Sequence, residues 1–165
     1  MSGFVPSLVL FLAVFVAAVP WALPAAAGFI LPLLLIIFVF LLTIYRQRAL
    51  PAVSVFAAGL LMDVMTAGAL GYWAIIFLLT HSLANYYEKR AWTGRFGKLC
   101  AAFAMTAFTI SLFGWILASL YFFRLIDWRP MLIGGAVAIA LFPVVVWPFR
   151  PSLGLVHLPM FAGRD

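Results

Sequence analysis

Residues 59–71 have the sequence GLLMDVMTAGALG, which places the only acidic residue of a long apolar run among turn-forming glycines. A carboxylate in hydrocarbon costs about 2.5 to 3.5 kcal/mol on insertion scales, so Asp63 needs a protein or water partner. Gly68 and Gly71 are predicted to supply a turn, because positive φ angles cost glycine little. We therefore expect a tight helical hairpin over residues 51–87, with Asp63 close to its turn.

The composition indicates an integral membrane protein. Of the 165 residues, 68% are hydrophobic and 8% are charged, and the mean hydropathy is +1.23. Soluble domains carry about 25% charged residues. A soluble core of this size could not bury so much apolar surface, whereas a bundle surrounded by lipid need not. We expect one membrane domain over residues 1–149 and a short tail over residues 150–165.

Six apolar segments are each near the roughly 20 residues that span about 30 Å of hydrocarbon. These segments are 4–20, 27–45, 51–67, 70–87, 99–123 and 130–149. They predict an all-α polytopic protein with a six-helix transmembrane bundle.

The basic residues predict how this bundle is oriented. Those that follow the second, fourth and sixth segments are Arg46, Arg48, Lys89, Arg90, Arg95, Lys98, Arg150 and Arg164. Only Arg124 and Arg129 fall on the other side. By the positive-inside rule the richer side is cytoplasmic, so both termini and the tail are expected in the cytoplasm.

Residues 22–27, ALPAAA, resemble the small-residue cleavage site of a signal peptide. The positively charged segment that precedes the apolar part of such peptides is missing. We therefore expect the first segment to be retained. Cleavage would leave the orientation of the other five segments unchanged.

Several classes of function find no support in the residue inventory. The net charge of +6 is explained by topology, since the basic residues lie in short loops, so nucleic-acid binding is not expected. Cys100 is the only cysteine, which excludes an intrachain disulfide. His81 and His157 are far apart, and one carboxylate within an apolar run is too few for a two-metal site. We expect no catalysis, metal or cofactor.

Asp63 has several candidate partners at its own depth. Thr66 lies one turn on, Tyr72 and Trp73 lie across the predicted turn, and Arg124 lies at the outer end of the fifth segment. An ion pair between Asp63 and Arg124 is our hypothesis, based on this shared depth.

His81 and Asn85 are one helical turn apart on one face of the fourth segment. Polar groups at such positions commonly tie membrane helices together, so we favour interhelical hydrogen bonds over a substrate site. A relay between Asp63 and His81 is not expected, because their levels differ by roughly 7 Å at 1.5 Å per residue.

The stretch with Gly59, Asp63, Thr66, Leu70 and Gly71 resembles the signature of the bacterial rod shape-determining protein MreD family. That signature is a Gly-Leu-Leu-x-Asp run followed by Leu-Gly. The chain length and the six-segment hydropathy also fit, although the resemblance is specific only over about residues 54–88.

The resemblance implies a small, non-enzymatic inner-membrane component of the cell-elongation machinery that helps maintain rod shape. Its partners would be the bitopic protein MreC, the actin-like MreB and, directly or indirectly, RodA and a penicillin-binding transpeptidase. The family's bundle is similar to the substrate-binding subunits of energy-coupling-factor transporters. One departure concerns the turn: the family often has glycine four residues after the aspartate, where this chain has Ala67.

A second hypothesis is a small-molecule carrier, or the substrate-binding subunit of a membrane transporter. Its pocket would lie near the outer leaflet and be lined by Asp63, Tyr72, Trp73 and Arg124. A carrier needs a water-accessible cavity with convergent polar groups, whereas a scaffold can pack its polar residues against each other. The small number of polar residues favours the scaffold.

Overall fold

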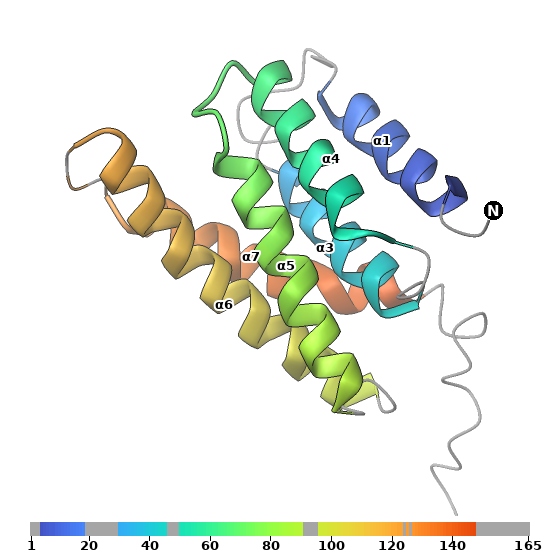
Figure 1. The fold of residues 1–165 in the computed structure, drawn as a ribbon. Helices are drawn as coiled ribbons and strands as arrows, with labels where there is room; N and C mark the ends of the chain where they lie inside the picture. Colours follow the sequence, from blue (N-terminus) through green and yellow to red (C-terminus); the bar gives the residue numbers. More distant parts are fainter. Residues whose placement is uncertain are drawn as a thin grey trace, which may run out of the picture.

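The computed structural model describes residues 4–18, 30–45, 50–90, 96–123, 125 and 127–147. All regular secondary structure within these ranges is helical, and no strand occurs in them (Figure 1). The helices are α1 (Phe4–Ala18), α3 (Ile30–Tyr45), α4 (Ala52–Met65), α5 (Tyr72–Lys89), α6 (Phe96–Tyr121) and α7 (Arg129–Val146).

Each helix overlaps one of the six predicted segments and begins and ends within three residues of it. The apolar runs alone therefore locate the helices. The suspected cleavage site at residues 22–27 and the predicted tail at 150–165 lie outside the described residues.

Two helices are long and apolar enough to cross a membrane, judged by length and composition. These are α6, with 26 residues, and α7, with 18. At 1.5 Å per residue α6 is about 39 Å long, more than the roughly 30 Å of a bilayer's hydrocarbon. Three of the other helices are apolar but shorter, the shortest being α4 with 14 residues.

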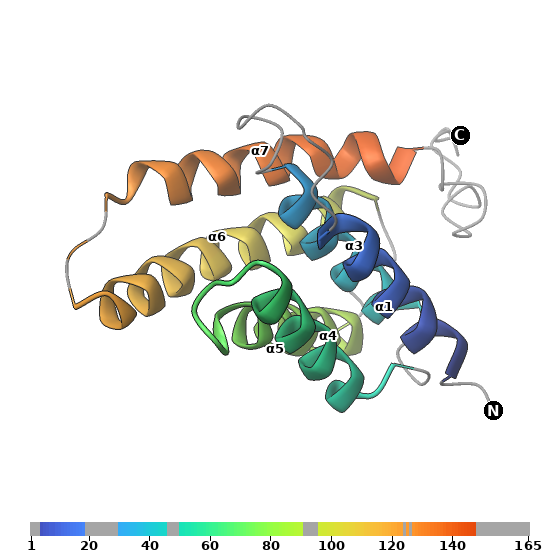
Figure 2. The same cartoon turned by 90° about the horizontal axis from the view of Figure 1, so that it is seen from above.

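The helices pack in two antiparallel pairs around α3. α4 lies along α5 and α6 lies along α7, while α3 contacts α1, α5 and α7 (Figures 1 and 2). Three fully buried rings join α3, α6 and α7: Phe40 meets Phe103 edge-on at 5.2 Å between centroids, and Phe103 stacks on Phe142 at 4.1 Å. This aromatic cluster ties the α6–α7 pair to the centre of the bundle.

The α6–α7 pair packs closely where Gly135 meets Ser111. A Cβ atom on Gly135 would lie 2.5 Å from the Ser111 hydroxyl oxygen, so a larger residue would require that side chain to move. Beyond this crossing the two helices diverge toward the loop that joins them (Figure 2).

The α4–α5 turn begins with a Schellman motif, the capping arrangement in which a left-handed residue follows the helix. The N–H of Gly68 donates to the carbonyl of Asp63 at 3.2 Å, and the N–H of Ala67 donates to that of Val64 at 3.3 Å. Ala67 holds the left-handed conformation, with φ of 48°, and Gly71 has φ of 93°.

The prediction for Gly71 is thus confirmed, whereas the prediction that Gly68 supplies a positive φ is wrong. The reason is register. The left-handed residue of a Schellman motif is the one directly after the helix cap, and with Thr66 as the cap that residue is Ala67. An alanine there costs roughly 1 kcal/mol relative to glycine.

We expect Ala67→Gly to stabilise the protein by about 0.5 to 1 kcal/mol, because it removes the left-handed penalty while adding some unfolded-state entropy. The measurement is the free energy of unfolding in detergent micelles. Ala69→Gly is the control, since Ala69 lies in the same turn but is not a positive-φ residue, and it should be neutral or destabilising. Equal effects of the two substitutions would contradict the assigned turn geometry.

The Asp63 hairpin as candidate functional site

Asp63 lies in the last turn of α4 with its side chain fully buried. Its carboxylate accepts hydrogen bonds from three backbone N–H groups at the start of α5. Oδ1 accepts from Trp73 at 2.8 Å, and Oδ2 accepts from Gly71 at 2.9 Å and from Ala74 at 3.4 Å. The partner of the buried carboxylate is therefore the beginning of the next helix.

These bonds complete the hydrogen bonding of the first turn of α5. A helix leaves its first N–H groups without partners inside the helix, and a side chain at the cap position normally satisfies them. Here the cap is Gly71, which has no side chain. The N–H of Tyr72 donates to the Ala69 carbonyl at 3.0 Å, and Asp63 satisfies the others from eight residues upstream.

The start of a helix is a favourable partner for a carboxylate. The first turn of a helix carries about half a positive charge, and anions are stabilised beside it. Hydrogen bonds to charged groups contribute about 1.5 to 3 kcal/mol each. Within the part of the chain that the structure describes, the partners of the Asp63 carboxylate are backbone N–H groups. The hypothesised partner Arg124 lies outside the described residues, so that pairing stays a prediction.

Gly59, one turn before Asp63, lets the two helices come together. A Cβ atom on Gly59 would collide with Cα of Ala74, and it would lie 2.7 Å from the Ala74 nitrogen and 2.8 Å from the Trp73 carbonyl oxygen. These are the residues whose N–H groups bond to Asp63. The backbone contact at Gly59 therefore holds α4 close enough to α5 for the Asp63 carboxylate to reach these N–H groups.

The remaining predicted motif residues lie at the edge of this arrangement. The Thr66 hydroxyl donates to the Met62 carbonyl at 2.8 Å and so helps close the end of α4. The Leu70 side chain is 69% exposed. Of the five motif residues, Gly59, Asp63 and Gly71 determine the hairpin geometry, whereas Leu70 points out of it.

The structure uses Tyr72 and Trp73 differently from our expectation of side-chain partners for Asp63. Trp73 contributes its backbone N–H. The two rings lie edge to face, 5.5 Å apart. The Tyr72 hydroxyl lies against Gly114, where a Cβ atom would be only 2.9 Å away, so Gly114 seats the start of α5 on α6.

His81 joins α5 to α3 by an interhelical hydrogen bond of the kind that we favoured, whereas the described bond of Asn85 is to His81 within α5. Its Nδ1 lies 2.9 Å from the hydroxyl oxygen of Thr43, and its Nε2 lies 3.0 Å from the side-chain nitrogen of Asn85. Thr43 in turn donates to the Val39 carbonyl at 2.7 Å. These three hydrogen bonds are compatible when Nδ1 carries the proton and donates to Thr43, and Nε2 accepts from Asn85.

Thr43 was missed in the sequence analysis. A signal for it existed, because it is one of the few polar residues in the apolar run of α3 and lies near its C-terminal end. His81 and Asp63 take separate partners, as expected from their different levels.

No group of three or more His, Cys, Asp or Glu side chains that could hold a metal ion occurs among the described residues. No protein-family model, curated protein or solved structure matches this chain. Function is therefore inferred from the hairpin and from the surface around it.

We expect Asp63→Ala to destabilise the protein by at least about 3 kcal/mol, since it leaves three helix N–H groups without their acceptor. Asp63→Asn keeps one acceptor oxygen but turns an NH₂ group toward N–H donors. It should therefore also lose most of the stability that the carboxylate provides. The measurement is unfolding in micelles. Asp127→Asn is the control, because Asp127 is exposed and accepts a single backbone N–H, that of Arg129. A mild Asp63→Asn effect, no larger than the control, would contradict the capping role.

A second prediction concerns the backbone contact. Gly59→Ala should force α4 and α5 apart and lower the amount of folded protein severely, because its Cβ meets backbone atoms that cannot rotate away. Gly97→Ala, in the first turn of α6, has no atom within 4 Å of the new Cβ and should be neutral or stabilising by up to about 1 kcal/mol. Gel filtration of matched preparations distinguishes the two, and a well-folded Gly59→Ala protein would refute the close contact.

Proposed function

We propose that this chain is a non-enzymatic membrane scaffold of the bacterial cell-elongation machinery, of the MreD type. The observation that supports this most is the use of the signature residues. Gly59 and Gly71 shape the hairpin, and both oxygens of Asp63 are taken by backbone N–H groups. Because both of its oxygens are bonded, this carboxylate stabilises the hairpin and is not available to react with a substrate.

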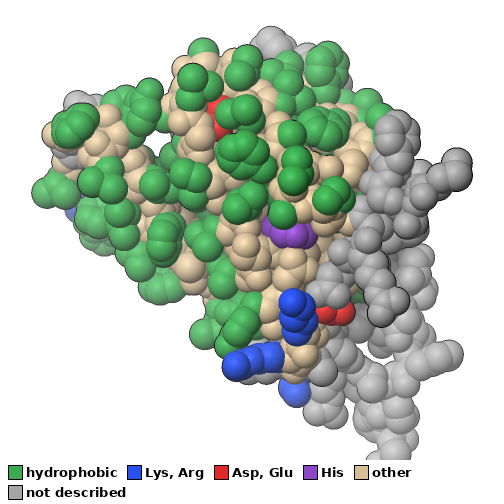
Figure 3. Space-filling model, viewed as in Figure 1, with side chains coloured by type: hydrophobic (Ala, Val, Ile, Leu, Met, Phe, Trp, Pro, Cys, Tyr) green, Lys and Arg blue, Asp and Glu red, His purple; other side chains and the backbone are tan. Residues whose placement is uncertain are grey.

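The proposed location is the bacterial inner membrane, with six spans and both termini in the cytoplasm. The surface supports this location. Of the residues in the most apolar windows of α6 and α7, 39% and 22% are buried, whereas the core helix of a soluble protein is mostly buried. Hydrophobic side chains cover most of the face in Figure 3, and its Lys and Arg side chains gather mainly at the end where α5 stops.

The proposed partners are an MreC-like bitopic protein, with MreB, RodA and a penicillin-binding transpeptidase engaged directly or indirectly, together with membrane lipids. The exposed face of α4 is suited to such contacts. Val53, Phe56, Leu60 and Val64 recur at helical spacing and are 39% to 77% exposed. Because Asp63 and Gly59 hold α4 against α5, this face has a fixed orientation that a partner helix can recognise.

The carrier hypothesis receives less support. Its pocket was expected to include Asp63 as the charged group that binds substrate. The Asp63 side chain is fully buried, and its oxygens already accept three hydrogen bonds. A substrate would have to displace the start of α5 to reach it.

The test is a tagged pull-down from solubilised membranes at matched expression, with retained proteins identified by mass spectrometry. Wild type and the control Gly97→Ala should both retain a bitopic protein and peptidoglycan synthases. Asp63→Ala should lose them in proportion to its loss of folded protein.

One outcome would contradict this proposal, and another would change the role assigned to Asp63. Recovery of ATP-hydrolysing subunits, or of a tightly bound small molecule alone, would favour the carrier. A fully folded Asp63→Ala protein without partners would mean that the carboxylate contacts a partner itself.

A further inference from the structure

The outward side of α5 carries a stripe of exposed side chains that ends in a positive charge. Ile75, Leu78, Ser82, Tyr86 and Arg90 follow one another at intervals of three or four residues, so they lie on one side of the helix. Tyr86 is 48% exposed, Ile75 45% and Leu78 36%. These three side chains, which we call the α5 strip, lead to Arg90, the exposed residue at the end of the helix.

The guanidinium group of Arg90 is held against this strip by Tyr86. Its central carbon lies 4.5 Å from the centre of the Tyr86 ring, which is a cation–π contact. The Tyr86 ring in turn meets that of Tyr87 edge-on, with 5.6 Å between the centroids. Within the described part of the chain, no hydrogen bond joins the Arg90 side chain to another residue. Its N–H donors are therefore available to an anionic ligand.

Two further cations lie at the same end of the bundle. Lys89 is the last residue of α5, Lys98 lies in the first turn of α6, and both are exposed. Because only residues 90–95 join the two helices, these charges stay at one end of the pair, where Figure 3 shows basic side chains gathered. The described acidic residue of this end is Glu88, and it forms no ion pair with a described cation.

Helix stability does not account for all three cations. Lys89 and Arg90 suit the end of α5, because the carboxyl end of a helix carries partial negative charge. Lys98 is in the opposite situation, since the first turn of α6 carries partial positive charge and a lysine there is unfavourable to the helix. Three cations gathered without a carboxylate partner repel one another, and an external anion relieves this repulsion.

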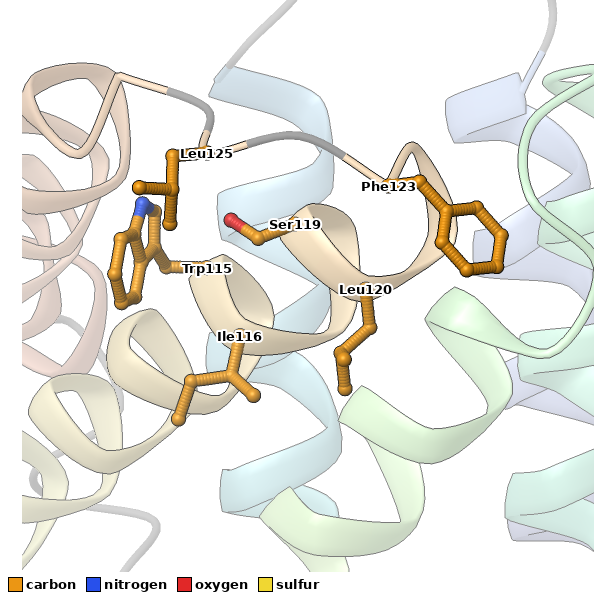
Figure 4. Close-up of a pocket in the computed structure, with 6 residues that line it drawn as sticks. All are labelled: Trp115, Ile116, Ser119, Leu120, Phe123 and Leu125. Carbon is orange, nitrogen blue, oxygen red and sulfur yellow. The ribbon is translucent and has the colours of Figure 1, made fainter.

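The other end of α6 has a different character. A shallow hollow there is lined by Trp115, Ile116, Ser119, Leu120, Phe123 and Leu125, of which five are apolar (Figure 4). No charged side chain is among these lining residues, so the hollow offers nothing that selects an anion. The exposed Arg129 begins α7 and supplies a reference cation far along the chain from Arg90.

We propose that Arg90, together with Lys89 and Lys98, binds the phosphate of an anionic phospholipid whose hydrocarbon chain lies along the α5 strip. Arginine and lysine both bind phosphate, and each basic residue close to anionic lipid adds attraction. A free phosphate would use the cations alone, whereas a phospholipid also covers the apolar side chains beside them. The inference rests on the membrane placement proposed above, though not on the identity of the protein partners.

The test is a lipid titration of the detergent-solubilised protein, read by native mass spectrometry as the apparent Kd of the first bound lipid. Phosphatidylglycerol and phosphatidylcholine with identical chains are titrated separately, and wild type should bind phosphatidylglycerol more tightly. Arg90→Gln should weaken phosphatidylglycerol binding about fivefold, the contribution of one basic residue near anionic lipid, and leave phosphatidylcholine binding unchanged. Arg129→Gln is the control, because it removes the same charge elsewhere, and it should change neither.

A second set of variants tests the ring that holds Arg90. Tyr86→Leu should weaken phosphatidylglycerol binding, whereas Tyr86→Phe keeps the face of a ring and should retain most of it. Tyr121→Leu is the control, because Tyr121 is a comparably exposed tyrosine, at 56%, near the other end of α6. It should have no effect. Unfolding of each variant in micelles confirms that the compared proteins are equally folded.

Three results would overturn the proposal. Equal weakening by Arg90→Gln and Arg129→Gln would mean that only the net charge of the protein matters. Displacement of the lipid by an equal concentration of inorganic phosphate would mean that the site takes a free anion. Absence of any bound lipid, on a protein that stays soluble without detergent, would refute the membrane placement itself, which separates that failure from failure of the lipid site.

Discussion

The carboxylate of Asp63 and the first N–H groups of α5 form the contact on which the hairpin depends. The first N–H groups of a helix need acceptors from outside that helix, and those of α5 face the fully buried side chain of Asp63. Gly71 provides the positive φ that lets the chain enter α5, but it brings no side chain to cap the helix. The cap therefore comes from Asp63 in α4, and the two helices cannot separate without exposing three N–H groups and a charge.

The rest of the hairpin follows from placing that carboxylate correctly. Gly59 brings the backbones into contact at the residues that Asp63 caps. The Schellman turn fixes the number of residues between the helices, and it uses the Asp63 carbonyl as acceptor for Gly68. Asp63 thus ends one helix with its backbone and begins the next with its side chain. This double use fixes how α4 lies against α5, and therefore which of its side chains face outward.

The helices could be predicted from the sequence because each is a run of apolar residues with polar or turn residues at its ends. The partner of Asp63 could not, because an N–H group belongs to every residue and carries no sequence signal. The charge of Asp63 suggested Arg124 as a partner, and that pairing stays a prediction, whereas Gly71 at the start of a helix was the residue that pointed to the N–H groups. The positive φ of Ala67 could not be predicted for a similar reason, because its left-handed conformation is imposed by the end of α4 and not by the residue itself. Thr43 is visible in the sequence as a polar residue in the apolar run of α3, but its pairing with His81 could be recognised only once α3 and α5 were known to be neighbours.

Backbone hydrogen exchange in the folded wild-type protein tests the central claim most directly, since it observes the capped N–H groups without a substitution. Residue-resolved exchange should show Gly71 and Trp73 protected to the same degree as the interior of α5. The adjacent turn residue Leu70, whose side chain is 69% exposed, should exchange much faster and serves as the internal reference. Exchange of Gly71 and Trp73 as fast as that of Leu70 would mean that Asp63 does not cap α5 and that a different contact holds the hairpin together.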